Sequence, residues 1–299
     1  MNLGHNLPYS KQLNLMDPQL SYTHKALTDR RVPNPFYRYL APEKFPGALR
    51  NQATVTVASL LRPYPQYGTL TQTNTHGRLN RYHALQARVL RAFSRGYSFV
   101  WAYNYNRERN TEFFNADDQY LERFTFQPGN MPRHRMNLAG TYDFPFGRGR
   151  AHLANLHPVA NAILGGWFTS SVFTIGSGAF MRFGQMITDG SNPRLDNRSR
   201  ERMFDTSKFQ KPEPYTPRTN PWQYPGVVGP KSWTMDTTIS KIFPIRERFD
   251  LEFRFEAYNL FNTFIPTDPV MNVLSPLFGR SINQANAGRE MQYCLRLIF

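Results

Sequence analysis

The segment "RFDLEFRFEAYN" (residues 248–259) alternates apolar and charged side chains with a period of two residues. The apolar positions are Phe249, Leu251, Phe253, Phe255 and Ala257, and the charged positions are Asp250, Glu252, Arg254 and Glu256. Successive side chains of a β-strand point to opposite faces, so this pattern predicts a strand with one apolar and one charged face.

The same alternation occurs along much of the chain. It is clear in "YSFVWAYNYN" (97–106), "RHRMNLAGTYDF" (133–144) and the final "MQYCLRLIF" (291–299). Further candidate strands span 69–76, 82–93, 167–183 and 232–244. Strands of globular proteins usually have about five or six residues, whereas a tilted strand needs about nine to eleven to cross a bilayer. Most of these candidates are long, which favours about eight membrane-spanning strands.

The connections between these strands alternate in length. Two are tight, "SRG" (94–96) and "PIRER" (244–248), and three are long and rich in Pro, Asn and Gly: 107–132, 184–231 and 264–290. Outer-membrane barrels combine short periplasmic turns with longer extracellular loops. The pattern therefore predicts an all-β fold, an antiparallel transmembrane β-barrel segment whose carboxyl-terminus lies on the periplasmic side.

Two parts of the chain depart from this regular pattern. Residues 147–166 fall on the short-turn side, yet they are long enough to hold a short helix. Residues 1–68 are rich in Pro and Asn, so we expect an irregular loop region there and the barrel strands within 69–299.

A soluble β-sandwich would also alternate, but it predicts shorter strands and closely spaced turns. Loops of more than about fifteen residues are uncommon in compact domains. The aromatic face of 97–105 would also need a cover in water. A membrane barrel therefore explains the pattern better than a sandwich does.

Composition excludes several classes of protein. No run of eighteen apolar residues occurs, which excludes a transmembrane helix. The single cysteine, Cys294, excludes an internal disulfide framework and a multi-cysteine metal site. The first twenty residues lack the basic and apolar regions of a secretory signal.

The net charge of +15 raises nucleic acid as a partner. The basic residues are scattered, however, and many lie in segments such as "PRLDNRSRERM" (193–203) rather than on one helix face. Scattered charge of this kind is typical of solvated or anion-facing surfaces, so no nucleic-acid partner is expected.

Several motifs, in order and spacing, resemble the carboxyl-terminal part of TonB-dependent outer-membrane receptors of the Oar-like branch, whose amino-terminal region carries a carboxypeptidase-regulatory-like domain. They are "VPNPFY" (32–37), "LLRPYPQY" (60–67), "YHALQARVLRAFSRGYSFVWAY" (82–103), "DFPFGRGR" (143–150), "ILGGWFTSSVFTIGSG" (163–178), "MFDTSKF" (203–209), "TISKIFPIRERFDLEFRFEAYNLFN" (238–262) and "FGR" (278–280). The resemblance implies a 22-stranded type of barrel and energised uptake of a solute. Such receptors are longer and carry a plug that contacts TonB, so we expect this chain to be an N-terminally incomplete product that is not active alone.

The resemblance also assigns a role to the last strand. Tyr293, Leu295, Leu297 and Phe299 are similar to the signal by which the barrel assembly machinery recognises outer-membrane proteins. The implied location is the cell outer membrane, and the implied partners are its lipid and lipopolysaccharide, the assembly machinery, an unidentified transported ligand, and TonB through the plug region alone.

No motif of an enzyme is present: the chain has no G-x-S-x-G, no P-loop and no H-E-x-x-H. The histidines are scattered, and His152 and His157 have no carboxylate or cysteine cluster nearby in the sequence. We therefore expect no catalytic residue, no cofactor and no metal site.

Three groups of residues have expected structural or binding roles. Asp250, Glu252, Arg254 and Glu256 should form an ion-pair ladder facing the lumen, since the arginine holds neighbouring carboxylates ionised. Tyr97, Phe99, Trp101, Tyr103 and Tyr105 should lie at the membrane interface. The longest loop carries Arg194, Arg198, Arg200 and Arg202, with Arg182 and Arg218 beside them, and arginine forks suit the phosphates of lipopolysaccharide or another anionic ligand.

Two other functions fit parts of the sequence. A small outer-membrane barrel or adhesin of about eight strands would close by itself without transporting a solute. A soluble basic β-protein would bind nucleic acid with strong salt dependence.

Overall fold

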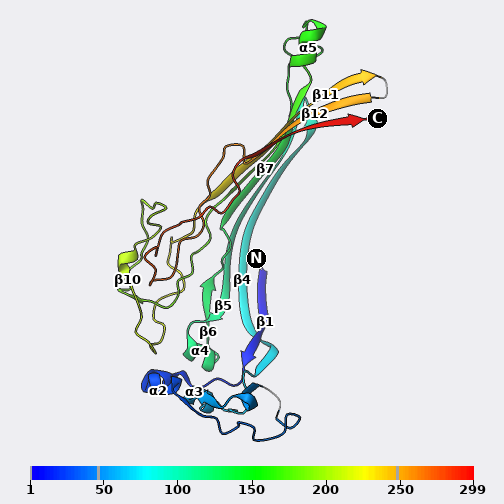
Figure 1. Cartoon of the computed structure of the whole chain (residues 1–299). Coiled ribbons are helices and arrows are strands. Elements are labelled where there is room, and N and C mark those ends of the chain that lie inside the picture. Colours follow the sequence, from blue (N-terminus) through cyan, green and yellow to red (C-terminus); the bar gives the residue numbers. More distant parts are fainter. Residues whose placement is uncertain (1, 46–47, 247–248) are drawn as a thin grey trace.

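The chain forms an open, antiparallel sheet of nine strands in the order β1-β4-β5-β7-β8-β11-β12-β13, with β6 paired to β5. The computed structural model describes residues 2–45, 48–246 and 249–299. The long strands lie side by side and arch together (Figure 1). Their bounds are β1 Asn2–Gln12, β4 Thr71–Ser94, β5 Tyr97–Phe113, β6 Phe124–Pro128, β7 His134–Asp143, β8 Trp167–Gly176, β11 Ser232–Arg246, β12 Phe249–Tyr258 and β13 Glu290–Ile298.

The other elements are short and lie in the connections. They are α1 Pro18–His24, α2 Ala26–Asp29, β2 Arg31–Pro33, η1 Ala48–Asn51, β3 Thr54–Thr56, α3 Val57–Leu60, α4 Ala116–Tyr120, α5 Pro158–Leu164, β9 Ile187–Thr188, η2 Thr206–Lys208 and β10 Phe209–Gln210. Among the described residues, no helix has the length and apolar character needed to cross a membrane.

Most predicted strands are confirmed, including those around 97–106, 133–144, 232–244, 248–259 and 291–299. The helix predicted within 147–166 is present as α5. The tight turn at 94–96 joins β4 to β5. The turn predicted at 244–248 lies partly outside the described residues, because 247–248 are not among them.

Three predicted boundaries are wrong. The candidates 69–76 and 82–93 are one continuous strand, β4, and the strand predicted to reach residue 183 ends at Gly176. The predicted loop 107–132 begins with the extension of β5 and contains β6, which pairs with it. The extension of β5 is paired with β4 and β6, so its ladder continues past the predicted strand end.

The prediction of an irregular region over 1–68 is wrong at its start. β1 occupies Asn2–Gln12 and pairs with the first half of β4, from Thr71 to Tyr82. Its sequence contains Pro8 and lacks a clean alternation, and its pairing carries three register shifts. The strand is therefore specified by its neighbour rather than by its own pattern.

The register gives the sheet one apolar and one polar face. Directly paired residues share a face, and the row Phe99, Gly140, Ser171, Thr237 and Ala257 crosses five strands in this way. The face of this row, called the apolar face below, also carries Trp101, Leu138, Phe173, Met235, Phe253, Phe255, Tyr293 and Leu295. The opposite, polar face carries Ser98, Asn104, Asn137, Thr174, Asp236, Glu252 and Arg254.

The sheet has free edges at the level of the long strands. Beyond Tyr82, β4 pairs with β5 alone among the described strands, and β13 pairs with β12 alone. Both edges therefore present backbone groups that the described part of the chain leaves without a ladder partner.

The two ends of the sheet differ in their connections. The turn between β4 and β5, α5 and the carboxyl-terminus lie at one end (Figure 1). The segments 177–231 and 259–289 extend from the other end. This division matches the short and long sides of an outer-membrane barrel.

Candidate functional site

The two long segments at the end of the sheet away from α5 fold together into a compact unit, called the loop assembly below (residues 177–231 and 259–289). Its buried core consists of Met181, Phe183, Met186, Met203, Phe204, Phe209, Tyr224 and Val227, with Met271, Val273 and Phe278 packed against it. The sequence predicts a strand up to residue 183 and loops at 184–231 and 264–290, and it does not indicate this core because most of the core residues follow neither a helical nor a strand period. The sequence feature that could have indicated a buried core is the large number of aromatic and methionine residues in these Pro-rich segments.

Phe204 lies at the centre of this core and is 0% exposed. Its ring meets the ring of Phe183 edge-on with centroids 5.0 Å apart, and it meets Phe278 of the second segment at 5.3 Å. The backbone N–H of Met203 donates to the carbonyl of Gly279 at 3.0 Å. These contacts join the two segments into one unit.

Arg218 holds the turns of the loop assembly together from inside. Its guanidinium donates to the carbonyl oxygens of Asn220 at 3.0 Å, of Gly184 at 2.9 Å and of Phe183. It also lies over the ring of Trp222, with the Cζ atom 3.6 Å from the centroid. Burial, with a smaller contribution from nearby Arg182, lowers the pKa of Arg218 to about 10. The side chain therefore remains a cation at neutral pH and acts as a buried donor.

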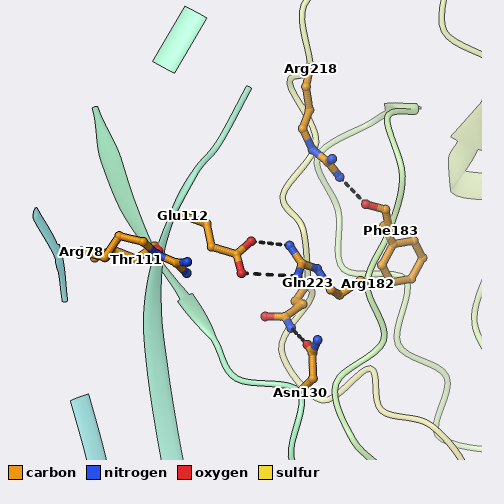
Figure 2. A network of polar contacts seen from close by, with 8 residues as sticks. All are labelled: Arg78, Thr111, Glu112, Asn130, Arg182, Phe183, Arg218 and Gln223. Atoms are coloured by element: carbon orange, nitrogen blue, oxygen red, sulfur yellow. Dashed lines mark hydrogen bonds and ion pairs between the residues drawn. The ribbon is translucent and has the colours of Figure 1, made fainter. Parts of the chain in front are cut away.

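A second arginine joins the loop assembly to the sheet. Arg182 forms an ion pair with Glu112 of β5, with one guanidinium nitrogen 2.5 Å and the other 3.4 Å from the two carboxylate oxygens (Figure 2). Its guanidinium also lies 4.6 Å from the centroid of the Trp222 ring. Nearby, the amide of Gln223 donates to Asn130 at 3.2 Å, so a second contact links the loop assembly to the segment that follows β6.

The position of Glu112 shows which side of the sheet the loop assembly occupies. Along β5, the even-numbered residues from Ser98 to Asn110 lie on the polar face. By the same alternation Glu112 points to that side. The loop assembly is therefore fastened on the polar side of the sheet, at the end away from α5.

A recess of about 430 Å³ opens beside this ion pair. It is lined by aromatic rings and charged side chains, among them Tyr9, Arg78, Glu112, Phe113, Phe124 and Trp222. The indole N–H of Trp222 is buried and has no hydrogen-bond partner within the described residues. A surface of this composition can stack on a ligand and donate hydrogen bonds to it.

We expect Arg218→Lys to weaken the loop assembly by about 2 kcal/mol, because a lysine cannot reach three carbonyl groups with one rigid fork and leaves buried acceptors unpaired. The measurement is the protection of amide protons in 184–231 from hydrogen exchange. Arg198→Lys is the matched control, since Arg198 donates to one carbonyl, that of Val228. Equal loss of protection in both variants would contradict the role given to Arg218.

Acid is expected to destabilise the loop assembly through Asp205 and Asp189. A hydrogen bond from Ser207, then one from Arg202, lowers the pKa of Asp205 below its ordinary 3.8, and bonds from Ser191 lower that of Asp189. Because the folded pKa values lie below the unfolded ones, this stabilisation is present above the ordinary value and is lost as the pH falls through the folded pKa. The urea midpoint of the loop assembly, followed against pH, should fall less steeply for Asp205→Asn than for the unchanged chain. Parallel curves would contradict this origin.

The loop arginines singled out in the sequence do not gather into one cluster. Arg194 pairs with Asp196 at 3.3 Å, Arg202 pairs with Asp205 at 2.5 Å, and Arg200 lies over the ring of Phe264. Arg194, Arg200 and Arg202 are exposed. Contact with lipopolysaccharide or another anion therefore stays a prediction.

The charged residues of β12 do lie together. Arg254 donates to Glu252 at 3.1 Å and to Glu256 at 3.2 Å. Asp250 shares their polar face and is opposite Ile298 in the register. The carboxylates and the arginine thus follow one line along the polar face.

The aromatic residues of β5 share the apolar face, but they lie at different positions along the strand. Residues 97 and 105 are separated by roughly 27 Å along the strand, and an outer-membrane barrel has an apolar band about 25 Å tall. We expect Tyr97 and Tyr105 at the two interfaces, with Phe99 and Trp101 between them. Tyr103 and Tyr105 both contact His134, with Tyr103 Oη 2.8 Å from His134 Nδ1.

The residues of the predicted assembly signal lie on the last strand of the sheet. Tyr293, Leu295 and Leu297 are exposed on the apolar face of β13, opposite Phe255, Phe253 and Leu251, and Phe299 follows the strand and is exposed. Recognition by the assembly machinery stays a prediction.

Comparison with known proteins gives one match. A family model described as "Outer membrane beta barrel domain" matches residues 2–292. No similar curated protein and no similar solved structure was found.

Proposed function

This chain belongs to the outer membrane beta barrel domain family, and from that premise we propose that it forms the carboxyl-terminal barrel portion of a TonB-dependent, Oar-like receptor that takes up a solute. As a member of this family it is an outer-membrane barrel protein. The TonB-dependent, Oar-like type of receptor and the uptake of a solute are the proposal.

The open sheet is the observation that carries the proposal. The second half of β4, beyond Tyr82, and the whole of β13 have a free edge in the described part of the chain. In a bilayer such edges are untenable, because their backbone groups find no hydrogen-bond partners in lipid. Further strands that complete a large barrel would satisfy both edges, and transporters with 22 strands enclose a plugged lumen of this kind.

The position of the loop assembly supports a receptor. It is a folded unit at the extracellular end, fastened on the polar side by Arg182 and Glu112. The recess beside that pair carries aromatic, cationic and anionic side chains. We propose that the solute meets the receptor here before it enters the lumen.

The proposed activity is binding and passage without covalent chemistry. Energy would come from TonB acting on the plug region of the complete receptor. Outer-membrane lipid, lipopolysaccharide and the barrel assembly machinery are the other proposed partners, and nucleic acid is not one of them.

An antibody against residues 184–231 tests this proposal on fractionated cells of the native host. We expect a band far above 34.8 kDa, the mass of this chain, in the outer membrane. We also expect the periplasmic domain of TonB to capture that species.

Two other outcomes would overturn the proposal. A heat-modifiable band of 34.8 kDa in the outer membrane would indicate a small barrel that closes alone. A soluble product that binds nucleic acid with strong salt dependence would exclude a receptor.

A further inference from the structure

The connection between β7 and β8 is ordered by its own hydrogen bonds and is not a simple turn. It spans residues 144–166 and contains α5, and it is called the α5 excursion below. The backbone N–H of Phe144 donates to the carbonyl of Trp167 at 2.9 Å and closes the excursion at its base. Inside it, the side-chain oxygen of Asn161 accepts from the backbone N–H of Arg148 at 2.8 Å, and the Arg148 side chain donates to the carbonyl of Leu156 at 3.0 Å.

Glycines allow the two limbs of the α5 excursion to touch. Gly147 has a φ of +114°, and a Cβ atom on it would lie 2.7 Å from the Cα atom of Gly165. A side chain at residue 147 would therefore force the limbs apart. The excursion is held in one shape by its own contacts.

The carboxyl end of α5 lies on the apolar side of the sheet. Trp167 and Lys241 are paired neighbours on the apolar face. The Trp167 indole donates to the carbonyl of Ile163 at 2.8 Å, and the Lys241 ammonium donates to the carbonyls of Ala162, at 2.6 Å, and Gly165. A lysine on a lipid-facing surface is costly unless its charge finds partners. The last carbonyls of α5 supply them.

The outer surface of α5 is apolar and uncovered. Val159 is 64% exposed, Ile163 is 63% exposed and Leu164 is 51% exposed. Val159 and Ile163 are four residues apart, so they lie on the same side of the helix. Asn161 points the other way, into the excursion.

Basic and aromatic groups surround this apolar surface at the same end of the sheet. Arg148 and Arg150 are exposed in the excursion. On the apolar face, Arg91 lies 4.0 Å from the centroid of the Tyr97 ring, and Lys241 lies 5.5 Å from that of Trp167. Amphipathic cations and aromatic rings of this kind are typical of a membrane interface.

We propose that the α5 excursion is an interfacial segment that lies in the periplasmic leaflet of the outer membrane. Val159, Ile163 and Leu164 are inserted at the boundary between phospholipid headgroups and acyl chains. The inference depends on membership of the barrel family and not on the proposed uptake of a solute. The short-turn end of the sheet is the periplasmic end.

Phospholipid is the occupant because the helix surface continues the apolar face, which lipid covers along the strands. Exposed arginines beside apolar side chains match the phosphate and acyl layers of one leaflet. The lysine and indole contacts hold the helix against that face and not against the polar lumen. A protein partner would need no such continuity with the lipid-facing surface.

Fluorescence quenching tests the proposal in the full polypeptide that carries this chain, reconstituted in phosphatidylcholine vesicles. In a Cys294→Ser background, a bimane label is placed at residue 163 through Ile163→Cys. The matched control is Asn155→Cys, which lies in the same excursion and is exposed. Vesicles with brominated acyl chains report lipid contact, and iodide reports water contact.

We expect brominated lipid to quench most of the emission at residue 163, with iodide quenching several-fold weaker than at residue 155. Free access of iodide to both labels would overturn the proposal. Protection of residue 163 from iodide without quenching by brominated lipid would also overturn it, because it would mean that protein covers the helix. The same samples should retain heat-modifiable migration, which shows that the labelled chains are folded.

Discussion

Replacing Phe204 with alanine is expected to lower the free energy of unfolding of the loop assembly by about 3–5 kcal/mol, the usual cost of deleting a fully buried phenylalanine. Phe204 is 0% exposed and contacts Phe183, Phe209 and Phe278. Because Phe278 comes from the second segment, the cavity would separate 259–289 from 177–231 as well as loosen the first segment. Hydrogen exchange in both segments measures the effect.

Phe264→Ala is the matched control for this experiment. Phe264 lies in the second segment, and it is 41% exposed and stacks with Arg200. Its truncation should cost less than about 1 kcal/mol, as substitutions at the surface usually do. If Phe204→Ala changed exchange in the first segment alone, Phe204 would not be the link between the two segments.

The barrel strands could be predicted from the sequence because each one carries its own evidence. In β12, the alternation from Phe249 to Ala257 assigns both faces without knowledge of any neighbour. The register then places most of the large apolar residues of β5, β7, β8, β11 and β13 on that same face. The exceptions on the polar face include Val100, Phe168, Val172, Ile242 and Ile298. A period of two is a local property, so local reasoning finds it.

The loop assembly could not be predicted in this way because its order depends on contacts between distant residues. Phe204 and Phe278 are 74 positions apart in the printed sequence and yet their rings meet. The sequence indicates Arg182 and Arg218 as anion-facing loop residues, whereas the structure gives Arg182 a carboxylate on β5 and Arg218 a set of loop carbonyls. The residue types were informative, but their partners depend on the tertiary fold.

Opposite faces of one strand should respond oppositely to a new charge. Leu138 lies near the middle of β7 on the apolar face, between Trp101 and Phe173, and is 39% exposed. An arginine on the lipid face near the bilayer midplane destabilises an outer-membrane barrel by about 2–4 kcal/mol. We therefore expect Leu138→Arg to reduce the amount of assembled protein in the outer membrane and to lower its urea midpoint.

The adjacent residue provides the control that makes this result specific. Asn137 lies on the polar face, between Ala102 and Thr174, so Asn137→Arg adds the same charge one position away but places it on the face that we expect to line the aqueous lumen. Its cost should stay within about 0.5 kcal/mol. If both variants were tolerated equally, the apolar face would not face lipid, and the lipid contact inferred for α5 would lose its basis because α5 is docked on that same face. A severe defect in Leu138→Arg alone would instead fix the outward direction of the sheet, and with it the lumenal position of the ion pair between Arg182 and Glu112.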